Sequence, residues 1–149
     1  MALLFMLRGY HSQIRFTNGR YDITLMRAGQ DGTRSVEVKW DKRASESGNL
    51  YFEVENTRQQ KPSGVMATTA DLWCHVLGEG ERGLIVSVAA LRRFLNEGSW
   101  RSVHTRGADS NSRGLLVPWT AVQASPDFRS VRLPTVEDYF GAIFRQASS

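Results

Sequence analysis

Residues 35–40 read Ser35-Val-Glu-Val-Lys-Trp40, and apolar and charged side chains alternate along this stretch. Successive side chains of a β-strand point to opposite faces of the sheet, so an alternating pattern predicts a half-buried strand. The two valines and Trp40 would share the buried face. Glu37 and Lys39 would lie together on the opposite face.

The neighbouring sequence predicts that this strand belongs to an antiparallel hairpin. Residues 21–26 alternate in the same way, with a turn signal, Asn18-Gly19, before them and a glycine-bounded reversal at 29–32 after them. Residues 50–55 alternate again and follow a polar link. We therefore expect three consecutive antiparallel strands.

Beyond these strands the sequence predicts a mixture of helices, strands and loops. Glycine or proline marks the helix ends, since Gly9 and Gly98 follow two apolar segments and Pro134 precedes the last one. Thr135 is suited to cap that last helix. Further helices are expected at 2–8, 68–73 and 89–96, strands at 73–77 and 84–88, and exposed loops at 57–64 and 106–114. With 149 residues, the chain is predicted to be a single α/β domain, 1–149, with a central mixed sheet flanked by helices.

The charge of the chain favours acidic partners without identifying one. The formal net charge is +4, which attracts phosphate polyanions such as DNA. An ordinary solvated surface would give the same composition, so the charge permits nucleic-acid binding and does not establish it.

The cysteine and histidine content argues against a disulfide-stabilised protein and against a zinc-binding one. Cys74 is the single cysteine, so no intramolecular disulfide can form, and the three histidines lack the paired spacing of zinc sites. The apolar residues 1–7 are far fewer than the roughly 20 that a membrane-spanning helix needs. We expect no membrane association and a cytoplasmic location.

The residues that suggest chemistry are Asp22, Glu37 and Lys39. Asp22 lies fifteen residues before Glu37, on the strand that we expect to neighbour it. Two carboxylates from adjacent strands could bind Mg²⁺ or Mn²⁺, because hard divalent cations prefer oxygen ligands. Lys39 could stabilise charge on a phosphate or position a water molecule. The alternative is a solvated strand face on which the two acids meet by coincidence.

This arrangement resembles the PD-(D/E)XK nuclease superfamily, in which an acid on one strand precedes an acid-x-Lys motif on the next. The matching pieces are Tyr21-Asp22 and Glu37-Val38-Lys39, and residues 37–41, 47–53, 69–73 and 107–118 are similar to segments of small phage-type members. The resemblance implies a restriction-endonuclease-like core and hydrolysis of DNA by an endonuclease. Asp22 and Glu37 would hold Mg²⁺ or Mn²⁺, and Lys39 would be the catalytic lysine, in the cytoplasm of a bacterial or phage-infected host cell.

One departure from the superfamily leaves the activity open. Many members carry another glutamate on the first helix, whereas residues 1–20 contain no Asp or Glu. Glu53 could supply the further carboxylate, or it could be an exposed acid on a strand edge. A partner subunit or an upstream segment could also supply it. Otherwise the site is impaired, and the alternative function is a catalytically impaired module that binds DNA or assembles with other proteins.

Several polar and basic residues are candidates for contacts with DNA, although any protein surface offers similar groups. A homodimer is also expected, because cleavage of two strands is most simply achieved by two symmetry-related sites. The predicted DNA contacts are Lys42, Arg43, Asn49, Arg58, Lys61, Thr69, Arg106 and Arg113.

Overall fold

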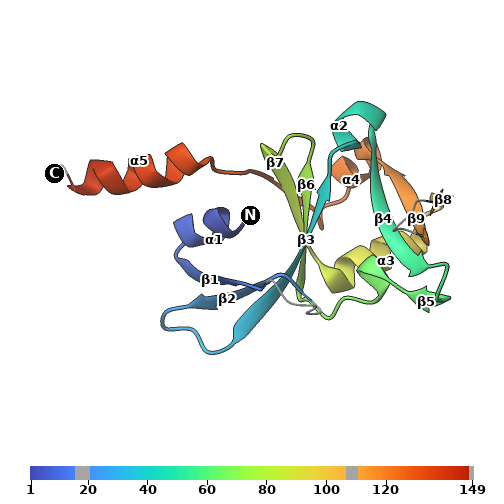
Figure 1. The fold of residues 1–149 in the computed structure, drawn as a ribbon, viewed down its shortest axis with the longest axis horizontal. Helices are drawn as coiled ribbons and strands as arrows, with labels where there is room; N and C mark the ends of the chain where they lie inside the picture. Colours follow the sequence, from blue (N-terminus) through green and yellow to red (C-terminus); the bar gives the residue numbers. More distant parts are fainter. Residues whose placement is uncertain (16–20, 107–110, 148–149) are drawn as a thin grey trace.

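The computed structural model describes residues 1–15, 21–106 and 111–147, and for Arg106 and 142–147 it describes the backbone alone. The chain forms two β-sheets with helices around them (Figure 1). It is an α/β protein whose central sheet is mixed and flanked by helices, as the sequence predicts. The Asn18-Gly19 turn lies outside the described residues.

The larger sheet has six strands in the order β1-β2-β3-β6-β7-β10. Its middle strand, β3, pairs antiparallel with β2 and parallel with β6. The predicted hairpin of residues 21–40 is thereby confirmed. The strands are β1 (Tyr10–Ile14), β2 (Ile23–Arg27), β3 (Thr33–Asp41), β6 (Leu72–Leu77), β7 (Arg82–Ser87) and β10 (Arg129–Arg132).

The smaller sheet has the order β5-β4-β9-β8 and corrects the prediction of a third strand beside β3. β4 pairs antiparallel with β9 instead. Both sides of β3 are occupied by β2 and β6, and a short helix with a left-handed Gly48 (φ 66°) turns the chain away from β3. The elements are α2 (Ala44–Ser47), β4 (Asn49–Asn56), β5 (Lys61–Pro62), β8 (Arg101–Arg106) and β9 (Asn111–Pro118).

Apolar clusters cover both faces of the larger sheet. On one face, Phe5 of α1 (Ala2–Leu7) packs with Val36 and Cys74. On the other face lies the main core, in which Leu91 of α3 (Val88–Glu97) packs between the two sheets with Phe52 of β4. Because the charged face of β3 points toward this main core, it is partly covered rather than fully solvated.

The predicted helix ends are confirmed. Gly98 follows α3, and Ser87 caps its start by accepting a hydrogen bond from the Ala90 amide at 3.1 Å. Thr135 caps α5 (Val136–Ala147), since the Asp138 amide donates to its Oγ1 at 3.1 Å. Figure 1 shows α5 extending away from both sheets. No helix in the described ranges is long and apolar enough to cross a membrane.

Trp40 does not occupy the buried face that its position in the alternating pattern predicts, because 54% of its surface is exposed. β2 begins at Ile23, opposite Val36, so the hairpin does not extend alongside Trp40. Its indole Nε1 donates to the Gly78 carbonyl at 2.7 Å, and Lys42 Nζ lies 4.8 Å from the ring centroid. The side chain is therefore anchored outside the core.

Three further segments differ from their predicted structure. Residues 68–73 are not a helix: a 3₁₀ turn, η1 (Gly64–Met66), precedes β6, and Asp71 Oδ2 accepts a hydrogen bond from the Ser35 amide at 2.7 Å. That bond fixes the segment as an extended approach to β6. The predicted loop at 106–114 includes part of a hairpin, because β9 already begins at residue 111. Likewise, the loop at 57–64 contains β5.

Candidate functional site

The candidate site begins where Asp22 meets β3. The Asp22 amide donates to the Val36 carbonyl at 2.9 Å, and its carboxylate Oδ2 accepts from the Val38 amide at 2.7 Å. These bonds hold Asp22 against the β3 backbone on either side of Glu37. Asp22 lies just before β2, which begins at Ile23. Its side chain, and not only its backbone, can therefore bond to the backbone of β3.

Glu37 is half-buried on β3, where it is paired in the sheet with Trp73 of the main core. The Thr68 hydroxyl Oγ1 donates to Glu37 Oε2 at 3.3 Å. Burial and then the negative charge of Asp22 raise the pKa of Glu37, and the Thr68 hydrogen bond and the Lys39 charge offset this only partly. Two carboxylates therefore repel each other in a partly desolvated place, where a bound cation would relieve the repulsion.

Lys39 shares the face of β3 with Glu37, since the two residues are separated by one position on the strand. Its side chain is exposed, and its positive charge favours the ionised form of Glu37, although burial and the Asp22 charge outweigh it and keep the pKa of that carboxyl raised. The structure therefore brings Asp22, Glu37 and Lys39 into one electrostatic neighbourhood, as the sequence predicts for the candidate site.

Glu53 does not join these residues. Its neighbour Phe52 points toward Trp73, at 6.4 Å between ring centroids, so Glu53 points away from the larger sheet. Within the described ranges, no group of three or more His, Cys, Asp or Glu side chains could hold a metal ion. The site thus offers a pair of carboxylates, which fits Mg²⁺ because this ion commonly takes one or two carboxylates and keeps several waters.

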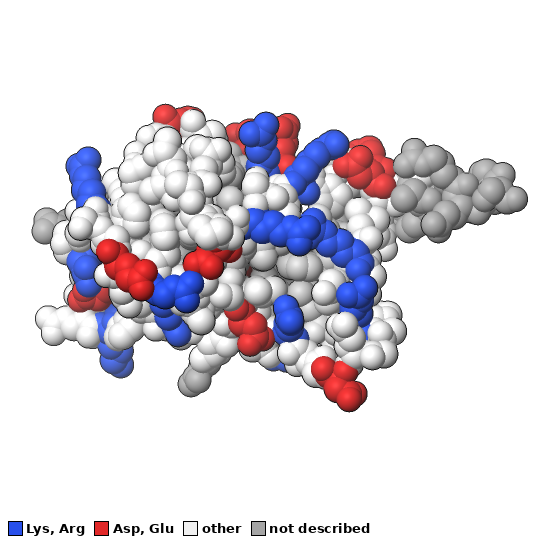
Figure 2. Space-filling model, turned by 180° about the vertical axis from the view of Figure 1, so that it is seen from behind, with Lys and Arg blue, Asp and Glu red and all other residues white. Residues whose placement is uncertain are grey.

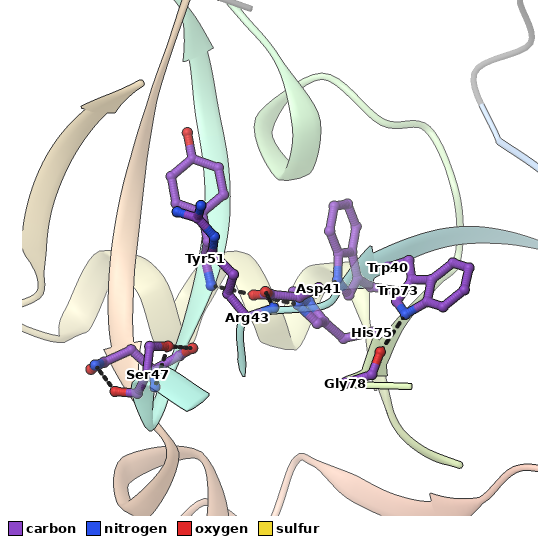
Figure 3. A network of polar contacts seen from close by, with 9 residues as sticks. Trp40, Asp41, Arg43, Ser47, Tyr51, Trp73, His75 and Gly78 are labelled. Atoms are coloured by element: carbon purple, nitrogen blue, oxygen red, sulfur yellow. Dashed lines mark hydrogen bonds and ion pairs between the residues drawn. The ribbon is translucent and has the colours of Figure 1, made fainter. Parts of the chain in front are cut away.

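A second polar network lies at the end of the same strand and was not predicted from the sequence. Figure 3 shows Asp41 between the backbone of Tyr51 and the ring of His75. Asp41 Oδ2 accepts from the Tyr51 amide at 3.0 Å and contacts His75 Nε2 at 3.4 Å. The Trp73 indole donates to His75 Nδ1 at 3.2 Å, which leaves Nε2 as the nitrogen that donates to Asp41.

This network joins the two sheets, since Asp41 belongs to β3, His75 to β6 and Tyr51 to β4. Burial acts to raise the pKa of Asp41, but the hydrogen bonds from His75, Tyr51 and Arg43 outweigh it and lower the pKa. His75 is 1% exposed, so it is not open to a substrate. The network is therefore a structural connection beside the candidate site.

Thr68 is the second feature that sequence reasoning missed. The sequence argument selected Thr69 from the Thr68-Thr69 pair, yet Thr69 is exposed and Thr68 contacts Glu37. The pair itself was the available signal. Which threonine turns inward depends on the register of β6 against β3, in which Glu37 lies beside Trp73, and that register is a long-range property.

The predicted DNA-contact residues occupy different environments. Arg43, Arg58 and Lys61 have exposed side chains and are available to phosphates. Asn49 instead stabilises its own turn, because its side-chain amide donates to the Ser47 carbonyl at 2.7 Å. Arg113 Nε is paired with Glu55 Oε2 at 2.7 Å.

The last two predicted contacts are Lys42 and Arg106. The Lys42 ammonium lies over the Trp40 ring and is exposed, whereas the side chain of Arg106 lies outside the described residues.

Figure 2 shows basic side chains intermingled with acidic ones, with a continuous basic run on the half of the molecule nearer to α5. Exposed arginines also lie outside the predicted set, including Arg129 and Arg132 of β10. Positive charge is thus distributed over several surfaces.

Comparison with protein-family models, with curated proteins and with solved structures finds no match for this chain. The features of this α/β protein that bear on its function are the Asp22–Glu37 carboxylate pair and the neighbouring Lys39.

Proposed function

We propose that this chain is a divalent-metal-dependent DNA nuclease of the PD-(D/E)XK type, with a restriction-endonuclease-like core. The observation that supports the proposal most directly is the half-buried Glu37, whose pKa is raised by burial and by Asp22. The Asp22 and Glu37 carboxylates together carry a negative charge that a divalent cation would neutralise. Lys39 beside it matches the acid-x-Lys motif on which the resemblance depends.

In this proposal each side chain has a separate role. Asp22 and Glu37 hold Mg²⁺ or Mn²⁺, and the bound ion would polarise the scissile phosphate and promote ionisation of the attacking water. The Lys39 ammonium, which is exposed on the same strand face, stabilises the negative charge that develops on the phosphate. Held by backbone bonds to β3, Asp22 is oriented before substrate arrives.

DNA is the proposed substrate because the chain has a net charge of +4 and exposed cations on several surfaces. Arg58 and Lys61 would contact phosphates, which gives affinity without sequence readout. We propose endonuclease activity, with a homodimer as the arrangement that cuts both strands of a duplex.

Cleavage of covalently closed circular DNA tests this function, because an exonuclease cannot begin on a substrate without ends. Purified protein should nick or linearise the circle with Mg²⁺ or Mn²⁺ and should not do so with EDTA. Asp22→Asn, Glu37→Gln and Lys39→Met should each abolish cleavage, while Glu79→Gln, a change at an exposed turn residue, should leave it intact. Cleavage that persists in all three site variants would show that the activity belongs to a contaminant or another site.

The second candidate is a catalytically impaired module that binds DNA or assembles with other proteins. The observation in its favour is that only a pair of carboxylates, with no third acid grouped beside it in the described ranges, forms the candidate centre. Salt-sensitive DNA binding with no cleavage in either metal would favour this module over the nuclease.

A further inference from the structure

We infer that Thr68 is a positioning residue of the candidate metal centre, where it orients the Glu37 carboxylate, and that Arg92 of α3 holds Thr68 in place. The inference rests on the proposed function to the extent that Glu37 is a ligand of the ion. It adds two residues from outside the strands that carry the acids.

Among the described residues, the Thr68 hydroxyl contacts two groups, as a donor to one and an acceptor from the other. Its oxygen accepts from the Ala70 amide at 3.2 Å, and it donates to Glu37 Oε2 at 3.3 Å. An ionised carboxylate can only accept, so the hydroxyl proton points toward Glu37. Thr68 is 8% exposed, so water has little access to replace this bond.

Arg92 fixes the backbone that presents this hydroxyl. Its Nε donates to the Val65 carbonyl at 2.9 Å, and its Nη2 donates to the Thr68 carbonyl at 2.7 Å. The planar guanidinium fork binds two acceptors at once, which a lysine ammonium does not reproduce. Val65 is 0% exposed and belongs to the main core, as does Leu91, the residue next to Arg92.

The contacts therefore form a continuous connection from a core helix to the carboxylate. α3 carries Arg92, Arg92 holds the segment that ends at Thr68, and the Thr68 hydroxyl restricts rotation of the Glu37 carboxylate. Side chains that orient metal ligands typically change metal affinity by roughly 10–100-fold when they are removed. A threonine that merely satisfied a buried polar group would affect stability and leave ion affinity unchanged.

The test measures Mn²⁺ binding by calorimetry, independently of cleavage. Thr68→Val keeps the shape of the side chain and removes the hydroxyl, whereas Thr68→Ser keeps the hydroxyl. We expect Thr68→Val to weaken Mn²⁺ binding by roughly 10–100-fold, and we expect Thr68→Ser to stay close to wild type. Arg92→Lys should weaken binding in the same direction. Thr68→Ala replaces Thr68→Val if the valine variant fails to fold, as judged by circular dichroism.

The outcomes separate this inference from the nuclease proposal. If Thr68→Val is folded and binds Mn²⁺ as the wild type does, the positioning role is overturned and the nuclease proposal is unaffected. If the wild type binds Mn²⁺ through Glu37 and the valine variant binds weakly, but no DNA is cut, the positioning role stands and the nuclease proposal fails. A wild type that binds no Mn²⁺ overturns both.

Discussion

Replacing Glu37 with glutamine should stabilise the metal-free protein while it removes the ability of the site to hold an ion. Burial and the Asp22 charge raise the pKa of Glu37, so the ionised carboxylate is disfavoured in the folded state. Glutamine is neutral and nearly isosteric, and its carbonyl oxygen can still accept the hydrogen bond from Thr68. The substitution thus removes the unfavourable charge and keeps the favourable contact.

The size of the effect follows from the half-buried position of the side chain. Solvent screens charges at such a position, so the repulsion from Asp22 is discounted toward the range of exposed pairs, about 0.2–1 kcal/mol. With partial burial added, we expect a gain of about 0.5–1 kcal/mol in the free energy of unfolding at neutral pH. In a chain of this size, this raises the Tm by about 1–4 °C.

The pH dependence gives the sharper measurement. An acid whose folded pKa is raised stabilises the fold below its ordinary pKa and loses that contribution as the pH rises through the folded value. The wild type and Glu37→Gln should therefore unfold at the same denaturant concentration below about pH 4 and diverge above it. Urea titrations in EDTA measure the difference, and Glu79→Gln controls for the loss of one negative charge at an exposed position.

A Glu37→Gln variant that is less stable than wild type at neutral pH would refute this reasoning. That result would mean that Lys39 and Thr68 together favour the carboxylate more than burial and Asp22 disfavour it. An equal gain from Glu79→Gln would also refute it, because the effect would then arise from net charge alone.

Three further predictions concern Asp41, Mn²⁺ binding and Cys74. Asp41→Asn should lower the free energy of unfolding by about 1.5–3 kcal/mol at neutral pH, because Asp41 accepts charge-assisted bonds from the Tyr51 and Arg43 amides and from His75. Since the pKa of Asp41 is lowered, the stability it provides is present above its ordinary pKa and lost as the pH falls, so urea titrations should show the two proteins converging in acid. Mn²⁺ at 100 times its Kd should stabilise the wild type by about 2.7 kcal/mol and so raise its Tm, whereas the Tm of Glu37→Gln should not change. Equal Tm shifts in the two proteins would show that the ion binds elsewhere. Burial raises the pKa of Cys74 to about 12, so a thiol reagent at pH 8 should label the folded protein only as fast as it unfolds, and rapid labelling would contradict this burial.

The parts of the fold that sequence reasoning predicted correctly are those decided by local patterns. The strand at 35–40, the helix at 89–96 and the Thr135 cap depend on alternation, helical periodicity and hydrogen bonds within a few residues. The partner of β4 could not be predicted in this way. β6, a strand distant in the sequence, pairs with the side of β3 that β2 leaves open, so β4 pairs with β9 instead. The exposure of Trp40 likewise depends on where β2 begins.

The candidate site was predictable to the same extent. Asp22, Glu37 and Lys39 are near in sequence and lie on or beside one hairpin, so strand alternation is sufficient to bring them together. Thr68 and Arg92 come from a 3₁₀ turn region and a helix that reach Glu37 only through the packing of the two sheets. No local pattern distinguishes Thr68 from Thr69, because the choice is made by tertiary structure.

The contrast between Glu37 and Asp41 separates a candidate functional carboxylate from a structural one. Both lie on β3, at positions that share a strand face, and both are partly buried. Asp41 accepts from several donors and its pKa is lowered, whereas Glu37 lies near Asp22, accepts from the Thr68 hydroxyl, and has a raised pKa. Neutralising Asp41 should therefore destabilise the protein, and neutralising Glu37 should stabilise it. A side chain that costs stability in the metal-free fold is expected where binding a cation supplies the compensation.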